Sequence, residues 1–192
     1  MNNAPDPILV LASASPRRRE LLNSAGFNFT VSPADTDESP LPQEPVRDWI
    51  KRVALAKALA VAPNEPTKLI LAADTMVVLG ERVLGKPKDL AEAKSFLRSL
   101  SGATHEVLTA FALTGGPVKS PLTELVSSKV LFRPLSQAEI DLYLTFGESL
   151  DKAGGYAIQG RGLSLIQEVK GSLTNVMGLP LPEVIAALKP YF

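Results

Sequence analysis

Two serines and two arginines lie close together in the segment Ser13 to Arg18. An apolar run precedes this segment, and Ser15 and Pro16 are residue types preferred at the N-cap and the first position of a helix. Backbone N–H groups and the helix dipole favour an anion there, and guanidinium groups add charge-assisted hydrogen bonds. We therefore predict a phosphate site made of the two serines with Arg17 and Arg18. A capped helix with solvated arginines is the alternative.

Lys57 lies on the apolar side of a predicted helix, with Val53 and Val61 four residues to either side of it. An ammonium in that position needs an anionic partner, either a carboxylate or a ligand phosphate, because burying it unpaired is expensive. The alternative is that Lys57 lies at the edge of the apolar stripe and reaches water with its charged end.

Asp74 follows the apolar run Leu69 to Ala73, so we predict that its carboxylate lies at the end of a buried strand. That position suits a metal ligand or a general base, because open α/β sheets bind ligands beyond the carboxyl ends of their strands. Thr75 beside it adds a hydroxyl group. The alternative is an aspartate that only caps the turn into a hairpin.

The segment Gly80 to Pro87 nearly matches the phosphate-binding P-loop pattern, in which two glycines are followed by a lysine, here Lys86. The match fails because Pro87 replaces the Ser or Thr that would bind magnesium, and because the intervening residues have the pattern of a β-hairpin. Lys86 could still reach a phosphate from a loop between strands.

The segment Gly147 to Gly162 is rich in glycine and contains Gln159, whose amide offers a donor and an acceptor to the edge of a base. A glycine-rich turn without a binding role is the alternative. His105 is the only histidine, which excludes a multi-histidine zinc site. We expect it at the surface or in a satisfied core position rather than in a catalytic triad.

Helices and strands alternate early in the sequence and strands cluster later, which predicts an α/β fold with a mixed sheet. The expected helices cover residues 17–25, 46–61, 89–100, 136–146 and 181–188. The expected strands cover residues 8–12, 28–31, 68–73, 76–79, 82–84, 106–113, 122–132 and 163–169. Residues 33–45 are acidic and rich in proline, and should form a loop.

The composition is that of a compact soluble protein, with 45% hydrophobic and 21% charged residues among 192. A net charge of zero leaves no positive excess for binding a nucleic-acid backbone. The absence of cysteine excludes disulfides and thiolate chemistry. The start, Met1 to Pro7, lacks the features of a signal peptide, and no apolar run approaches transmembrane length. We therefore expect a cytoplasmic protein without membrane contact.

Several of these segments together resemble the Maf family, and the resemblance spans nearly the whole chain. They are SASPRRRELL at 13–22, the pair Asp37-Glu38, Lys57, AADT at 72–75, GKP at 85–87, GESLDKAGGYAIQG at 147–160 and NVMGLP at 175–180. Their order and spacing make the combination specific. The resemblance implies a fold related to inosine-triphosphate pyrophosphatases, a strongly twisted mixed sheet flanked by helices with a cleft between two lobes. It also implies one domain over residues 1–192 and a homodimer.

The resemblance further implies hydrolysis of nucleoside triphosphates to monophosphate and pyrophosphate. In this family pattern Asp74 is the proton acceptor, and Glu38 is a ligand of a metal or of the substrate. We expect a divalent cation, Mg²⁺ or Mn²⁺, to be held by Glu38 and Asp74. The pattern assigns five residues to the phosphates: Ser13, Arg17, Arg18, Lys57 and Lys86.

Three residues match the branch of the family that acts on dTTP and UTP, namely Arg17, Thr75 and Gln159. The branch that resembles 7-methyl-GTP pyrophosphatases differs at the positions of Arg17 and Thr75, so we rank it second. A nucleotide-binding regulator of cell division without turnover is the alternative from another class. The presence of the candidate base Asp74 argues against it, because a binding protein would not need one.

Overall fold

The computed structural model describes residues 8–192, so the expectation for Met1 to Pro7 lies outside the described residues. The helices are α1 (Pro16–Ser24), α2 (Val46–Val61), α3 (Leu90–Leu100), α4 (Gln137–Thr145), α5 (Leu173–Val176) and α6 (Leu181–Leu188). The strands are β1 (Leu9–Leu11), β2 (Phe29–Val31), β3 (Leu69–Leu79), β4 (Arg82–Leu84), β5 (Thr104–Thr114), β6 (Leu122–Phe132) and β7 (Ile166–Lys170). Short 3₁₀ turns lie at Ala62–Asn64, Ala153–Gly155, Gly160–Leu165 and Lys189–Tyr191. Within residues 8–192, no helix combines the length and apolar character needed to span a membrane.

The seven strands form one mixed sheet in the order β2-β1-β3-β5-β6-β7, and β4 pairs with β3. Strand β1 runs parallel to both β2 and β3, whereas β4 is antiparallel to β3 and β7 is antiparallel to β6. The expected mixed α/β fold, with helices flanking the sheet, is therefore confirmed.

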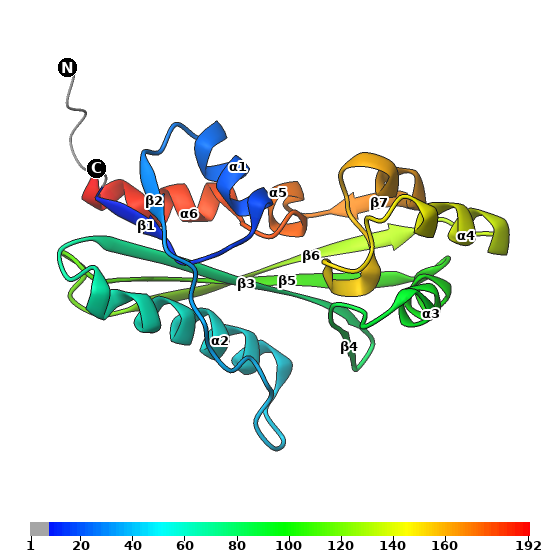
Figure 1. Cartoon of the computed structure of the whole chain (residues 1–192), viewed down its shortest axis with the longest axis horizontal. Helices are drawn as coiled ribbons and strands as arrows, with labels where there is room; N and C mark the ends of the chain where they lie inside the picture. The colour runs from blue at the N-terminus through cyan, green and yellow to red at the C-terminus, as the bar shows by residue number, and fades with distance from the viewer. Residues whose placement is uncertain (1–7) are drawn as a thin grey trace. The chain divides into compact units, whose positions relative to one another are not determined.

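Residue contacts divide the chain into two compact units. The first unit comprises the residues up to Asp74 together with Ala110–Leu125 and Gly178–Phe192, and the second comprises Thr75–Thr109 and Val126–Met177. Strands β3, β5 and β6, the long arrows of Figure 1, each continue from one unit into the other. Asp74 and Thr75 are neighbours in β3 but belong to different units.

The expected helix caps are present. Ser15 caps α1 by accepting a hydrogen bond from the Arg18 backbone N–H, and Pro16 is the first helical residue. Ser136 and Glu139 form the predicted capping box at the start of α4. These local signals explain why helices begin where the sequence predicts them.

Asp74 corrects one expectation, because it lies inside a strand rather than at the end of one. We predicted that a strand would stop at Ala73, but β3 runs without interruption from Leu69 to Leu79. Its neighbour β1 is the strand that stops there, since its last pair joins Leu11 to Leu71. Asp74 therefore lies beyond the carboxyl end of β1, although its own strand, β3, continues past it.

The core of the second unit buries His105, which is 2% exposed. Its Nε2 atom lies 2.7 Å from the Tyr156 hydroxyl, and its ring packs edge-to-face against Phe132 and Tyr156. Burial lowers the pKa of His105 to about 4, so the imidazole is neutral at physiological pH. Its Nδ1 atom has no hydrogen-bond partner among the described residues, so the core position is only partly satisfied.

Gly162 is required by close packing within the glycine-rich segment. A Cβ atom on Gly162 would lie 2.0 Å from the Ala157 carbonyl oxygen, whereas a Cβ on Gly85 would have nothing within 4 Å. We predict that Gly162→Ala lowers the free energy of unfolding by about 3 kcal/mol, because the backbone must move to relieve the clash. Gly85→Ala is the matched control and should change it by less than about 1 kcal/mol. Urea denaturation followed by circular dichroism measures both, and equal effects of the two substitutions would contradict the clash.

Candidate functional site

The turn between β1 and α1 contains the four predicted residues, and hydrogen bonds link Ser13, Ser15 and Arg18. Ser13 is buried, and its Oγ accepts hydrogen bonds from the Ser15 backbone N–H at 3.3 Å and from Arg18 Nη1 at 3.0 Å. Arg17 and Arg18 are both partly buried. The interpretation of this segment as a cap with freely solvated arginines is therefore wrong for Arg18, whose guanidinium forms part of the turn.

Arg18 is held by contacts at both ends of its guanidinium group. Its Nη1 donates to Ser13 Oγ, and its Nε donates at 2.8 Å to the carbonyl oxygen of Gly178, a residue of the NVMGLP motif. Burial lowers the pKa of the Arg18 guanidinium from its usual value; the charge of Asp74 opposes this shift and that of Arg17 adds to it. The arginine is thus fixed in orientation and lies within the electrostatic reach of the Asp74 carboxylate.

Lys57 lies between two carboxylates, as an inward-facing lysine requires. Its Nζ atom is 2.7 Å from Asp74 Oδ1 and 2.7 Å from Glu38 Oε1. The side chains of Lys57 and Asp74 are only 10% and 11% exposed, whereas that of Glu38 is 56% exposed. The alternative in which Lys57 reaches water is wrong, and the predicted partner is a carboxylate. Lys57 brings together the two residues expected to hold a metal.

Two residues of α2 that we did not predict position the acidic loop containing Glu38. Trp49 Nε1 donates to the Glu38 carbonyl oxygen at 2.8 Å, and Arg52 Nη2 donates to the Ser39 carbonyl oxygen at 2.8 Å. Arg52 also binds both carboxylate oxygens of Glu44 at 2.7 Å, which lowers the pKa of Glu44 to about 2. Trp49 and Arg52 are three residues apart and therefore lie on the same side of α2. That spacing was the available signal.

Glu38 and Asp74 form a pair of oxygen donors that suits a hard divalent cation. Among residues 8–192 no cluster of three or more His, Cys, Asp or Glu side chains could hold a metal alone. Mg²⁺, however, is usually bound through one or two carboxylates together with water and substrate phosphates. The two carboxylates on Lys57 therefore fit a cation that is completed by the substrate.

The second unit contains the other three predicted residues: Thr75, Lys86 and Gln159. The Thr75 hydroxyl is 3.1 Å from that of Thr109, and Thr75 is partly exposed. Lys86 and Gln159 are exposed, and neither side chain has a hydrogen bond or ion pair within the described part of the chain. Both side chains therefore remain available to a ligand.

The glycine-rich segment is fixed to the rest of the second unit at three points. The Gly154 N–H donates to the Gly85 carbonyl oxygen at 3.0 Å, which ties the segment to the loop of Lys86. The Ala157 N–H donates to the Tyr143 hydroxyl at 3.1 Å, and the Tyr156 hydroxyl meets His105. The segment that carries Gln159 is therefore anchored rather than a free turn.

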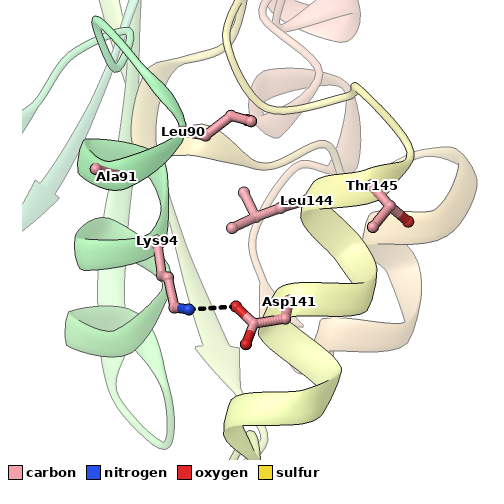
Figure 2. Close-up of a pocket in the computed structure, with 6 residues that line it drawn as sticks. All are labelled: Leu90, Ala91, Lys94, Asp141, Leu144 and Thr145. Atoms are coloured by element: carbon pink, nitrogen blue, oxygen red, sulfur yellow. Dashed lines mark ion pairs between the residues drawn. The ribbon is translucent and has the colours of Figure 1, made fainter.

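A pocket of about 350 Å³ lies between α3 and α4 in the second unit. None of the residues predicted for the functional site lines it. Figure 2 shows Lys94 of α3 reaching Asp141 of α4 across it, at 2.5 Å. The other lining residues are Leu90, Ala91, Leu144 and Thr145. The pocket is lined by apolar atoms around one exposed ion pair and is not part of the candidate site.

Comparison with known proteins identifies the family of the chain. The model of the family described as Maf-like protein matches residues 8–191. The chain belongs to the Maf family. Within it, a protein from Anaeromyxobacter dehalogenans (strain 2CP-C) is named dTTP/UTP pyrophosphatase and is 54% identical, and the alignment covers 95% of this chain and 93% of that protein. A protein of the same name from Myxococcus xanthus (strain DK1622) is 50% identical, and the alignment covers 97% of this chain and 94% of that protein. The solved structure of protein VC0702 from Vibrio cholerae has a TM-score of 0.45 at 11% identity, covering 95% and 93%.

The Lys57–Asp74 pair predicts a large stability effect, because removing one partner of a buried ion pair leaves an uncompensated charge. We expect Lys57→Met to lower the free energy of unfolding by about 3 kcal/mol at pH 7. Replacing Asp74 by asparagine in the same protein should recover most of this loss. The comparison is Lys94→Met, which breaks the exposed pair with Asp141 and should cost less than about 1 kcal/mol. Similar losses for the two lysine variants, measured in urea, would show that the Lys57 pair is not desolvated.

Proposed function

We propose that the protein hydrolyses nucleoside triphosphates, dTTP and UTP above all, to nucleoside monophosphate and pyrophosphate, as a cytoplasmic enzyme that cleans the nucleotide pool. The observation that carries this proposal is the Lys57 ammonium held between Asp74 and Glu38 beside the Arg18 turn. Cations for a triphosphate and carboxylates for a metal and a proton occur in one cluster. The relatives named dTTP/UTP pyrophosphatase support the same activity.

The phosphates bind to the turn between β1 and α1. The Ser13 and Ser15 hydroxyls and the N-terminus of α1 supply hydrogen-bond donors, and Arg17 and Arg18 supply positive charge. Arg18 reaches the phosphates with little loss of side-chain entropy, because Gly178 and Ser13 already fix its orientation. Lys86, which is exposed, is proposed as a further cation for the phosphates.

Glu38 and Asp74 would hold the divalent cation, Mg²⁺ or Mn²⁺. When bound, such a cation neutralises phosphate oxygens and makes a coordinated water more acidic. Lys57 contacts one oxygen of each carboxylate, at 2.7 Å in both cases, and so fixes the two groups next to one another before the substrate arrives. This preorganisation lowers the cost of forming the loaded site.

Asp74 accepts a proton from the water that attacks the α-phosphorus. The water oxygen forms the new bond to that phosphorus, and the bond to the bridging oxygen of the β-phosphate breaks. The bonding electrons leave with pyrophosphate, whose charge is stabilised by Arg18, Lys57 and the other cations. Lys57 orients the carboxylate through its bond to Oδ1, and the position of Asp74 beyond the carboxyl end of β1 suits ligand binding at that edge of the sheet.

Preference for a pyrimidine base is assigned to Arg17, Thr75 and Gln159. Gln159 has an exposed amide that can donate to and accept from the edge of a base. The segment that presents it is anchored by His105 and Tyr143.

The test of the proposal is pyrophosphate release across a nucleotide panel with Mg²⁺ or Mn²⁺. We expect kcat/KM to be highest for dTTP and UTP, at least tenfold above GTP and ATP, and release to stop in EDTA and return when the cation is restored. Faster release from 7-methyl-GTP than from UTP would assign the protein to the other branch of the family. Tight nucleotide binding without release from any triphosphate would favour a regulator.

The base role of Asp74 predicts a loss confined to the chemical step. Asp74→Asn should lower kcat by about 10² to 10⁴-fold, the usual contribution of general base catalysis, because an amide cannot accept the proton. Lys57 keeps Glu38 as a partner in this variant, so the fold should persist. The matched control is Asp141→Asn in α4, which should leave kcat unchanged. A folded Asp74→Asn protein with nearly normal kcat would remove Asp74 from this role.

A further inference from the structure

Arg52 of α2 joins the two ends of the segment that follows Glu38 in the acidic loop. Its Nε and Nη2 atoms donate to the two carboxylate oxygens of Glu44, each at 2.7 Å, and Nη2 also donates to the Ser39 carbonyl oxygen at 2.8 Å. The Glu44 side chain is only 10% exposed, so water has little access to this ion pair. One planar guanidinium group thus holds both ends of residues 39–44 on the helix.

The segment between these two ends is also restricted by its own contacts. The Leu41 N–H donates to Glu44 Oε2 at 2.9 Å, and the Glu44 N–H donates to the Leu41 carbonyl oxygen at 3.1 Å. Pro40 and Pro42 fix their φ angles on either side of Leu41. Few conformations therefore remain open to the segment once Arg52 holds its ends.

The place of Glu38 depends on these anchors more than on its own ion pair. Trp49 Nε1 donates to the Glu38 carbonyl oxygen at 2.8 Å, and the next carbonyl along the chain, that of Ser39, binds Arg52. The Glu38 carboxylate meets Lys57 at 2.7 Å, but its side chain is more than half exposed. An ion pair with so exposed a partner contributes less than it costs to order one residue of backbone. The Lys57 contact alone could therefore not hold the loop in place.

We propose that Arg52 and Trp49 are positioning residues for the divalent cation, which hold Glu38 where its carboxylate can join that of Asp74 as a ligand. This inference rests on the proposed function. Neither residue contacts the cation in this proposal. A carboxylate on an unanchored loop would have to lose the freedom of that loop each time a cation bound, and the affinity would fall accordingly.

The sign of the effect distinguishes positioning from simple electrostatics. The Arg52 guanidinium is positive, so its charge opposes the binding of a cation, and removing that charge would by itself strengthen the binding. Removing the anchor of Glu38 would weaken it. The two accounts therefore predict opposite changes in cation affinity for Arg52→Met.

The experiment titrates the full chain with Mn²⁺ and follows the electron paramagnetic resonance signal of the free ion. We expect Arg52→Met to raise the Mn²⁺ dissociation constant at least about tenfold, as is usual when a residue that orients a metal ligand is removed. The matched control is Lys51→Met, which removes an equal charge from the next residue of α2 and breaks an exposed contact with Asp48. It should change the constant by less than about twofold. An unchanged or lower constant for Arg52→Met overturns the proposal.

A double variant shows whether Arg52 acts through Glu38. Glu38→Gln alone should raise the Mn²⁺ dissociation constant, and adding Arg52→Met to it should cause no further change, because the ligand that Arg52 positions is already lost. Equal losses with and without Glu38, or a wild-type constant for Glu38→Gln, would refute the role. Trp49→Phe keeps the net charge, removes the N–H donor to Glu38 and should also weaken Mn²⁺ binding. It replaces Arg52→Met if that variant does not fold.

Trp49 is the only tryptophan of the chain, so its fluorescence reports the order of the loop without a label. We expect acrylamide to quench Trp49 more strongly in Arg52→Met than in Lys51→Met before any metal is added. Equal quenching in the two variants would mean that Arg52 does not hold the loop, and would overturn the proposal. The proposed function fails on a different result, a wild type that releases no pyrophosphate, and the Mn²⁺ constants still test the role of Arg52 in that case.

Discussion

The Lys57 ammonium, almost inaccessible to water, is held at 2.7 Å from each of two carboxylates. A buried ammonium without such partners would be strongly destabilising, so α2, β3 and the acidic loop must lie where they bring Lys57, Asp74 and Glu38 together. Trp49 and Arg52 fix the loop from the same helix. The ion pairs that allow α2 to carry a charged residue on its inner side therefore also bring together the two candidate carboxylates, Asp74 and Glu38.

A second feature is that the candidate residues are divided between the two units. The first unit holds the serines, arginines and carboxylates, and the second holds Thr75, Lys86 and Gln159. The division falls between Asp74 and Thr75 in a single strand.

Local signals in the sequence predicted most of the fold, and non-local contacts account for what they missed. The residue patterns predicted α2, β6 and α6 with the same bounds as in the structure. The four-residue helix α5 is too short for a periodic pattern, and residues 163–165 form a 3₁₀ turn where we predicted strand. Asp74 was misplaced because aspartate is rare within strands, and the end of β1 is visible only once β1 and β3 pair.

The candidate site was predictable in its residues but not in its contacts. Lys57 was identified from its place on an apolar stripe, yet nothing in the sequence chose between Asp74, Glu38 and a ligand phosphate as its partner. The anchors of Arg18 and Thr75, namely the Gly178 carbonyl and the Thr109 hydroxyl, are 160 and 34 residues away. Such pairings depend on tertiary structure, because side-chain type alone leaves many partners equally acceptable.

The two carboxylates on Lys57 differ in their freedom to change partners. Asp74 lies in β3, which pairs with β1 before Asp74, over Leu69–Leu71, and with β4 after it, over Val77–Leu79. Its position is therefore set by the sheet. Glu38 lies on a loop and is 56% exposed, so its carboxylate can exchange Lys57 for a cation or water at a small desolvation cost. Of the two carboxylates, Glu38 is therefore the one that can change partners, while the Lys57–Asp74 contact keeps the Asp74 carboxylate in place.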